Sequence, residues 1–386
     1  MLLVFHKTFH TIETYFNTYF ISFYRGNRMK KLIFLLILLF PFKVSALSAS
    51  SSIVMDLDNG RILHANNVYD ERLIASITKI MTAIVTIEYA DLDKTVEVGE
   101  EILDAYGSAI YIELGEKLTL RDLLYGLMLR SGNDAAVVIA KNVAGSMEAF
   151  AMLMNEVADR IGMDNTYFYN AHGLEEDDGS ANTSTAYDMA LLTKYAMENE
   201  TFREIFGAKN YTVKTNYKTY SWTSKNKLIH NHDFITGGKT GFTEKARRTL
   251  VTTGSNNNIN LVVVTLNDPN DFQDHLDLYE QIFREYEAVK VIDKDTFEVS
   301  QDNVYKDDTL YVLEDIYVPV TKEEKGNLRI EYELYKNNKY VDGDKVGSVR
   351  IYLGDELVRE ESIYVLVEEK EEKLSWWERF LRWIKW

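Results

Sequence analysis

The sequence contains no cysteine, and it is poor in positive charge. Its 386 residues include 43 lysines and arginines against 60 aspartates and glutamates, which gives a net charge of −17. Without cysteine there can be no disulfides, thiol nucleophiles or cysteine-ligated metals, although many exported bacterial proteins also lack disulfides. The acidic balance argues against nucleic acid as a partner. The chain is long enough for two domains and a large buried core.

Two short patterns that often mark cofactor sites are incomplete. His230-Asn231-His232 offers two metal ligands, but no third ligand follows at a suitable spacing and H-E-x-x-H is absent, so we expect a loop. Gly238-Lys239-Thr240 is similar to the end of a phosphate-binding loop, which would need a glycine where this chain has Asp233. The sequence therefore predicts neither a metal site nor a nucleotide site.

The N-terminal apolar run is too short to span a bilayer stably. Residues 29–46 have the layout of a secretory signal peptide, with a basic start, an apolar run over residues 32–40 and small residues at Val44-Ser45-Ala46. We expect cleavage after Ala46, and a retained membrane anchor is the alternative. Residues 1–28 are aromatic-rich and irregular, and we expect them to be an untranslated segment upstream of a start at Met29.

A serine and a lysine stand three residues apart at Ser76 and Lys79, at the start of an apolar run without glycine or proline. This pattern predicts a buried helix with Ser76 in its first turn. Residues three apart are neighbours on a helix, so the lysine amine should lie close to the serine oxygen. A serine needs a base to become a nucleophile, and a lysine serves only if burial or nearby positive charge lowers its pKa.

Two further motifs follow in order, Ser131-Gly132-Asn133 and Lys239-Thr240-Gly241. The first should lie on the connection between two buried apolar helices, where side chains can point into a cleft. The set of three resembles the signature of the penicillin-recognising serine acyl-enzymes. The flanking segments "GGKTGFTEKARRTLVTT", "LMLRSGNDAAVVIA", "NAHGL" and "STAYDMA" resemble the D-alanyl-D-alanine carboxypeptidases, low-molecular-mass penicillin-binding proteins that trim peptidoglycan stem peptides. The resemblance runs from about Ser50 to Glu287 and continues more weakly to the C-terminus.

The resemblance implies a role for each matching residue. Ser76 is the acylated nucleophile, Lys79 its base, and Ser131 a relay that passes a proton to the leaving D-alanine. The remaining roles are substrate-amide binding by Asn133, a positive field from Lys239, carboxylate binding by Thr240, close strand approach at Gly241, and an oxyanion hole from the backbone N–H groups of Ser76 and Phe242. Neither a cofactor nor a metal is implied, and β-lactam antibiotics would act as inhibitors.

The chain departs from the family pattern at two places. Ile74 stands where the family usually has proline before the Ala-Ser-x-x-Lys segment, which removes a stiffening residue but no chemistry. Arg247 stands where glycine is usual. Its neighbour Arg248 matches a position where arginine or tyrosine is common, and it either helps bind the substrate carboxylate or faces solvent.

The order of elements predicts an α/β (α+β) sandwich of the serine β-lactamase and transpeptidase type. A strand pair after residue 51 and a hairpin over residues 250–266 would form one antiparallel sheet, with a helical block between them and a last helix from about 271 to 287. We expect this catalytic domain to occupy residues 47–288. Residues 289–367 alternate in short runs and predict a small all-β domain, with strands at 296–299, 309–312, 317–321, 328–335, 345–353 and 363–367.

Residues 368–386 predict an acidic linker followed by an amphipathic helix, Leu374–Trp386. At about 100° per residue its leucines, tryptophans, phenylalanine and isoleucine share one face, and only Trp386 falls on the polar face. Tryptophan opposite arginine and lysine is typical of a helix lying in a membrane interface; packing on the protein's own body is the alternative. We therefore expect an exported protein on the outer face of the cytoplasmic membrane.

Two other functions remain open from sequence. A class A β-lactamase shares the three motifs, but it carries a deacylating glutamate in an E-x-x-L-N segment, and none occurs between Ser131 and Lys239. A cell-wall-binding protein that retains the cleft without turnover is the second. The preferred function is a penicillin-sensitive, serine-type D-alanyl-D-alanine carboxypeptidase whose substrate is a peptidoglycan stem peptide ending in D-Ala-D-Ala.

Overall fold

The structure is a computed structural model, and it describes residues 47–299, 304–306, 308–336 and 339–367. The buried hydrophobic side chains form two separate cores. The larger core belongs to the segment that carries the three motifs, and the smaller one draws its side chains from Ile292 onward. The expected signal peptide and C-terminal helix lie outside the described residues.

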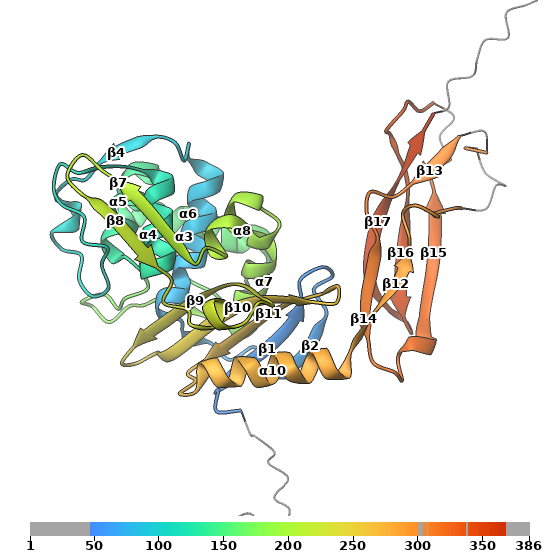
Figure 1. Cartoon of the computed structure of the whole chain (residues 1–386), viewed down its shortest axis with the longest axis horizontal. Helices are drawn as coiled ribbons and strands as arrows, with labels where there is room; N and C mark the ends of the chain where they lie inside the picture. Colours follow the sequence, from blue (N-terminus) through green and yellow to red (C-terminus); the bar gives the residue numbers. More distant parts are fainter. Residues whose placement is uncertain (1–46, 300–303, 307, 337–338, 368–386) are drawn as a thin grey trace, which may run out of the picture. The chain divides into compact units, whose positions relative to one another are not determined.

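A five-stranded antiparallel sheet supports the first segment (Figure 1), as the sequence predicts. Its strand order is β2-β1-β11-β10-β9, so strands from both ends of the segment pair in the middle, where Val54 of β1 lies opposite Val263 of β11. The side chains of β1 and β11 are buried on both faces of the sheet, which explains why successive residues in these strands are apolar. The strands are β1 Ser51–Asp56, β2 Ile62–Asn66, β9 Ile235–Thr243, β10 Arg247–Asn256 and β11 Ile259–Leu266.

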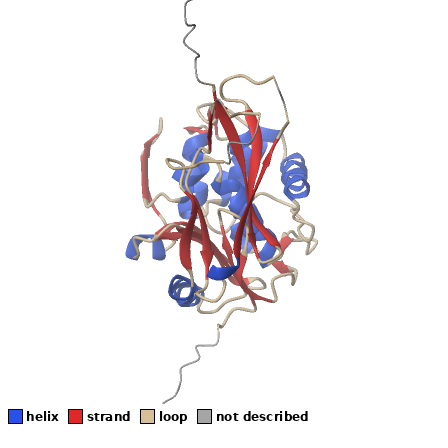
Figure 2. Ribbon diagram, turned by 90° about the vertical axis from the view of Figure 1, so that its right-hand side faces the viewer, coloured by secondary structure: helices blue, strands red, loops and turns tan. Residues whose placement is uncertain are grey.

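Helices cover both faces of this sheet (Figures 1 and 2). Helix α10, Asp271–Glu285, packs on β10 and β11, and the helical block lies on the opposite face, where α7 contacts β1 and β11. The block contains α3 Lys79–Tyr89, α4 Leu120–Arg130, α5 Asn133–Ala144, α6 Met147–Ile161, α7 Ala186–Met197 and α8 Glu200–Phe206.

Short elements connect these layers. The 3-10 turn η1 Ala75–Thr78 precedes α3, so Ser76 lies in a 3-10 turn rather than in the first turn of the α-helix. The His230 segment is a short helix, α9 Leu228–Asn231, and not the loop that we expected. The other short elements are β3 Arg72–Leu73, β4 Thr95–Glu97, η2 Glu100–Ile102, β5 Lys117–Thr119, β6 Thr183–Ser184, β7 Asn210–Lys214 and β8 Thr219–Thr223.

The C-terminal segment is built from strands, which confirms the small all-β part of the predicted fold. It has a two-stranded sheet, β12-β14, and a four-stranded sheet, β13-β17-β16-β15. The sequence analysis was wrong in two details. Residues 296–299 form no strand, and the strand β12, which was not predicted, begins directly after α10. The segment there is too short for its apolar pattern to distinguish a strand from the end of a helix. The elements are β12 Glu287–Ile292, β13 Thr309–Tyr311, β14 Ile316–Val320, η3 Lys325–Asn327, β15 Leu328–Leu334, β16 Lys345–Leu353 and β17 Glu356–Leu366.

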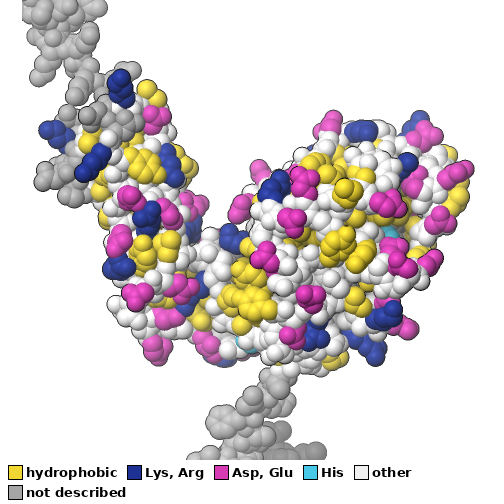
Figure 3. All heavy atoms as spheres, turned by 180° about the vertical axis from the view of Figure 1, so that it is seen from behind, with side chains coloured by type: hydrophobic (Ala, Val, Ile, Leu, Met, Phe, Trp, Pro, Cys, Tyr) yellow, Lys and Arg dark blue, Asp and Glu magenta, His cyan; other side chains and the backbone are white. Residues whose placement is uncertain are grey.

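Two surface properties can be stated for the described residues. No single helix among them is long and apolar enough to cross a membrane, although the bent pair α5 and α6 meets that criterion by length and composition alone. Figure 3 shows acidic and basic side chains interspersed over the face that it displays, with hydrophobic side chains in separate groups.

A buried histidine joins the last helix to the sheet. His275 of α10 has no exposed surface, and its two ring nitrogens are hydrogen-bonded to the hydroxyls of Thr252 on β10, at 2.7 Å, and Thr265 on β11, at 3.1 Å. Because burial opposes the charged form, the pKa of His275 falls from 6.5 to about 3. The imidazole is therefore neutral in the folded protein near neutral pH.

We predict that His275 makes the folded state sensitive to acid. Below pH 6.5 the unfolded chain protonates this histidine while the folded chain does not, so stability is lost as pH falls from 6.5 towards 3. His275→Gln should be destabilising near neutral pH, and the gap to wild type should shrink by about 2 kcal/mol by about pH 5. Urea denaturation across this pH range measures the gap, with the exposed His230→Gln as control. A gap that stays constant with pH would contradict the assignment.

Candidate active site

The predicted nucleophile Ser76 lies in η1, next to the edge strand of the five-stranded sheet. Ile74 just before it is fully buried, and its carbonyl accepts a hydrogen bond from Thr249 Oγ1 of β10 at 3.0 Å. A Cβ atom placed on Gly241 would lie 3.0 Å from the backbone nitrogen of Ser76, so glycine allows β9 to approach the turn closely. The nucleophile is thus fixed to the sheet by contacts on both sides.

Lys79 is fully buried, and its amine meets the nucleophile as the spacing predicts. Lys79 Nζ lies 3.0 Å from Ser76 Oγ, 2.8 Å from Asn133 Oδ1 and 2.5 Å from the carbonyl oxygen of His172. All three partners are uncharged, so they orient the amine without stabilising its protonated form as a carboxylate would. This arrangement suits a lysine that accepts a proton.

A second buried lysine faces the second motif. Ser131 is the C-cap of α4 and has a left-handed backbone, with φ of 63°. Lys239 Nζ of β9 donates to Ser131 Oγ at 3.0 Å and to the carbonyl of Thr240 at 2.6 Å. The structure therefore pairs a serine with a lysine twice within one site, once in Ser76–Lys79 and once in Ser131–Lys239.

The two lysine amines have lowered pKa values for the same reasons. Burial is the largest cause of the fall in the pKa of Lys79 well below its usual 10.5, followed by the positive charges of Lys239 and Lys225, while Asp134 acts in the opposite direction. Burial, and then the charge of Lys225, lowers the pKa of Lys239 to about 7. The lowered pKa of Lys79 is what a lysine base requires.

Asn133 is held from a neighbouring loop by backbone carbonyls. Its side-chain Nδ2 donates to the carbonyl of Tyr106 at 2.6 Å, and its backbone N–H donates to the carbonyl of Ser108 at 2.7 Å. With its Nδ2 held there, Asn133 Oδ1 is turned towards Lys79. Residues 106–108 could not be assigned to the site from sequence, because any residue type can supply a backbone carbonyl.

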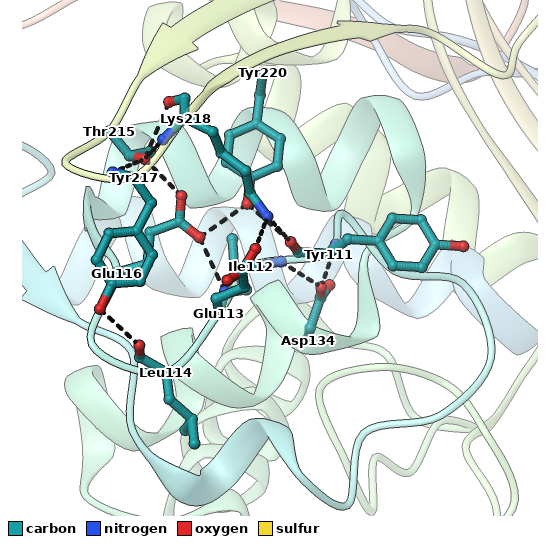
Figure 4. A network of polar contacts seen from close by, with 10 residues as sticks. All are labelled: Tyr111, Ile112, Glu113, Leu114, Glu116, Asp134, Thr215, Tyr217, Lys218 and Tyr220. Atoms are coloured by element: carbon teal, nitrogen blue, oxygen red, sulfur yellow. Dashed lines mark hydrogen bonds and ion pairs between the residues drawn. The ribbon is translucent and has the colours of Figure 1, made fainter.

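The next residue, Asp134, fixes the same loop further along (Figure 4). Its buried carboxylate accepts hydrogen bonds from the backbone N–H groups of Tyr111 at 2.8 Å, which Figure 4 shows, and of Ile110 at 3.0 Å. The carbonyl of Tyr111 in turn accepts from Tyr220 Oη at 2.8 Å and Lys218 Nζ at 3.0 Å. One loop is thus attached both to the second motif and to the β7–β8 hairpin. Asp134 directly follows the second motif in the sequence, and this position could have identified it as a residue of the site.

The segment "NAHGL", quoted from sequence only as part of the resemblance, supplies the remaining wall. Besides the His172 carbonyl that meets Lys79, it contains Gly173, whose φ is +84° and whose added Cβ would lie 2.1 Å from the carbonyl oxygen of Ala75. Asn182 ties the segment to η1 by donating to Thr78 Oγ1 at 3.0 Å. Burial, and then the charge of Lys79, lowers the pKa of His172 to about 3, so this imidazole is neutral.

The residues predicted to bind substrate lie on β9 and β10. Thr240 and Gly241 follow Lys239 along β9, and Phe242 comes next, opposite Arg248 of β10. The guanidinium of Arg248 forms a bidentate pair with Asp271, at 2.7 and 2.8 Å, so its charge is balanced within the protein. The roles predicted for these four residues remain predictions.

The Arg247 departure has a structural explanation. Its φ is 60°, in the left-handed region that favours glycine, which is the residue that the family usually has there. The side chain is exposed. Arginine is therefore accommodated at the cost of local backbone strain and without a packing clash.

The five predicted catalytic residues form two hydrogen-bonded groups, Ser76–Lys79–Asn133 and Ser131–Lys239. The groups adjoin, because Ser131 and Asn133 are two residues apart in the second motif and the charge of Lys239 acts on Lys79. No group of three or more metal-binding side chains occurs within the described ranges. The set offers a hydroxyl nucleophile, a base beside it and a second hydroxyl with its own lysine. These are the parts that acyl transfer through a covalent serine intermediate requires.

Two sequence families match the chain. The model of the D-alanyl-D-alanine carboxypeptidase family matches residues 41–270. The model of the penicillin-binding protein 5 C-terminal domain matches residues 286–371. The first match covers all three motifs, and the second covers most of the β-rich segment.

Individual proteins that resemble the chain are also D-alanyl-D-alanine carboxypeptidases or penicillin-binding proteins. The chain is 32% identical over 222 residues to D-alanyl-D-alanine carboxypeptidase DacF of Bacillus subtilis, covering 56% of each chain and so less than two thirds of that relative. It is 29% identical over 347 residues to DacC of Escherichia coli, covering 83% of this chain and 84% of that one. The crystal structure of penicillin binding protein 5 from Haemophilus influenzae superposes with a TM-score of 0.66 at 25% identity, covering 84% of this chain and 98% of that one.

We predict that Gly173→Ala reduces acylation about 100-fold, the size of effect expected when a catalytic contact is displaced by about an ångström. The added methyl group collides with the Ala75 carbonyl, so it must push apart the turn that holds Ser76 and the carbonyl that holds Lys79. The rate of labelling by a fluorescent penicillin measures the effect. Gly179→Ala is the matched control, because Gly179 has a φ of +87° in the same connection but nothing within 4 Å of the added Cβ. Equal losses in the two variants would mean that backbone strain, and not the collision, is responsible.

Proposed function

The chain belongs to the D-alanyl-D-alanine carboxypeptidase family, and on this premise we propose that it removes the terminal D-alanine from peptidoglycan stem peptides through an acyl-enzyme on Ser76. The observation that carries the assignment of residues is the contact between the buried Lys79 amine and Ser76 Oγ at 3.0 Å. The lowered pKa of Lys79 supports its role as the base.

In the proposed acylation, Lys79 Nζ accepts the proton of Ser76 as Oγ attacks the carbonyl carbon between the two D-alanines. Negative charge develops on the carbonyl oxygen, where the backbone N–H groups of Ser76 and Phe242 would stabilise it by several kcal/mol. The C–N bond then breaks. Ser131 delivers its proton to the leaving D-alanine nitrogen and regains one from the protonated Lys79, so that both side chains return to their starting states. Lys239, at 3.0 Å from Ser131 Oγ, supports that transfer.

Hydrolysis completes the proposed cycle. Water attacks the ester carbonyl and gives a proton to Lys79. The bond to Ser76 Oγ then breaks, Oγ takes that proton back, and the shortened peptide leaves. A β-lactam would be attacked in the same way, but its leaving nitrogen stays tethered to the acyl group, which favours a long-lived acyl-enzyme. The terminal carboxylate of the substrate would bind Thr240, with Arg248 as a candidate second contact.

The remaining regions fit the same proposal. We assign the catalytic domain to residues 47–288 and the small β domain to residues 289–367; the latter serves as a spacer or docking module, with binding of cell-wall partners as the alternative. Export by the segment 29–46 would place the enzyme on the outer face of the cytoplasmic membrane. Leu374–Trp386 would attach it to that surface. These two segments lie outside the described residues, and their roles rest on sequence.

The deciding experiment measures D-alanine release from a synthetic pentapeptide ending in D-Ala-D-Ala. A chain of residues 47–373 should release D-alanine and be labelled by a fluorescent penicillin, because the Lys79 amine lies 3.0 Å from Ser76 Oγ and has a lowered pKa. Ser76→Ala should abolish both signals, whereas Ser221→Ala, at an exposed serine of β8, should leave both unchanged.

The other results separate the alternatives. Ser76-dependent labelling without release would point to a different peptide bond or to a cell-wall-binding protein without turnover. Rapid destruction of penicillin would point to a β-lactamase. Absence of labelling would refute the acyl-enzyme proposal altogether.

A further inference from the structure

We propose that Lys225, which lies in none of the three motifs, is a positioning residue for the site: it clamps the loop at residues 106–108 against Asn133 and places a third positive charge beside Lys79 and Lys239. This inference rests on the proposed acyl transfer. It goes beyond that proposal because it gives an exposed lysine outside the motifs two roles: it helps to orient Asn133, and its charge acts on the amines of Lys79 and Lys239.

The backbone of Lys225 is fixed next to the second motif. Its N–H donates to the carbonyl of Leu129 at 3.1 Å, in the last turn of α4 before Ser131. The following residue, Asn226, is buried, and a Cβ atom placed on Gly238 would lie 2.3 Å from Asn226 Nδ2. The segment therefore lies between the end of α4 and the stretch of β9 that carries Lys239.

The side chain of Lys225 reaches back to the loop that holds Asn133. Lys225 Nζ donates to Ser108 Oγ at 3.0 Å, and the carbonyl of the same serine accepts the backbone N–H of Asn133 at 2.7 Å. Asn133 Oδ1 then receives Lys79 Nζ at 2.8 Å. An unbroken series of four residues thus leads from Lys225 to the base, and the ammonium of Lys225 sits at its outer end.

The charge of Lys225 acts on both buried amines. It contributes, after burial, to the lowering of the pKa of Lys79 and of Lys239. Two other charged groups act on these three lysines. Asp134 raises the pKa of Lys79. Desolvation, and then the charge of Arg130, lowers the pKa of Lys225 itself. Lys225 is the exposed member of the three lysines, so it is the one that water best stabilises when protonated.

The test is the pH dependence of acylation by a fluorescent penicillin, from about pH 6 to about pH 9, which follows the protonation of the base. In Lys225→Met the pKa values of both amines rise, so the whole profile should move to higher pH. The rate near pH 6 should fall about threefold and should recover as the pH rises. Lys225→Arg, which keeps the charge and a donor, should restore the wild-type profile.

Two further variants separate position from charge. Ser108→Ala removes the clamp but leaves the charge, so acylation should slow at every pH with the profile unmoved. Lys227→Met removes an exposed lysine two residues away and should change neither the rate nor the profile. Thermal denaturation of each variant confirms folding. If Lys225→Met does not fold, Lys225→Gln, which removes the charge and keeps a donor, carries the same expectation for the profile.

Several results would overturn the inference. A Lys225→Met profile that superimposes on that of wild type would eliminate the charge effect, and an unchanged rate in Ser108→Ala would eliminate the clamp. A raised KM for the pentapeptide with an unmoved profile would make Lys225 a substrate contact instead. In each of these cases the wild-type protein would still release D-alanine, so the proposed function would be unaffected. If the wild-type protein were not acylated at all, the proposed function itself would be refuted.

Discussion

The site depends on one physical constraint, the burial of two lysine amines without an ionic partner. Neither Lys79 nor Lys239 forms an ion pair with a carboxylate in the part of the chain that the structure describes; their partners are hydroxyls, an amide and backbone carbonyls. Burying a charged amine in this way is costly, so the amines move towards their neutral form. The constraint has two consequences. It lowers the pKa of Lys79, as a lysine base requires. It also requires every surrounding acceptor to be held in place, because a buried amine that loses its acceptors is destabilising.

That requirement explains why so much structure converges on a few atoms. Ser76 and Lys79 come from the η1–α3 junction, Ser131 and Asn133 from the α4–α5 junction, and Lys239 from the edge strand of the sheet. The "NAHGL" segment supplies the His172 carbonyl that accepts from Lys79, and the loop at residues 106–108 supplies the carbonyls that hold Asn133. Close approach of these segments needs glycine at Gly173 and Gly241, where a side chain would occupy the space of neighbouring backbone. The nucleophile and its base are therefore held by contacts between distant parts of the chain, and local helix geometry provides only the spacing between them.

This division also explains what could be predicted from sequence. The three motifs, the antiparallel sheet and the helix starts were predictable because they depend on residue type. Thr119, for example, forms a capping box at the start of α4, and Thr185 caps α7. The loop contacts were not predictable, since the atoms that meet Asn133 and Lys79 are carbonyls of Tyr106 and His172, which any residue would provide. The 3-10 turn at Ser76 and the short strand β12 were missed for a related reason, because the apolar periodicity of so few residues does not distinguish one backbone conformation from another.

The charge balance of the site has a further consequence under the proposed function. The charge of Arg248 is already balanced by Asp271, so the positive charges left for an incoming carboxylate are those of Lys239 and Lys225. A carboxylate bound at Thr240 would raise the pKa of Lys239 from about 7 and favour its protonated form. The charge gained at Lys239 would in turn oppose protonation of Lys79, because Lys239 is among the causes that lower the pKa of Lys79. Substrate binding would thus leave Lys239 protonated and Lys79 neutral. The carboxylate by which the substrate is recognised would therefore also favour the base form of Lys79.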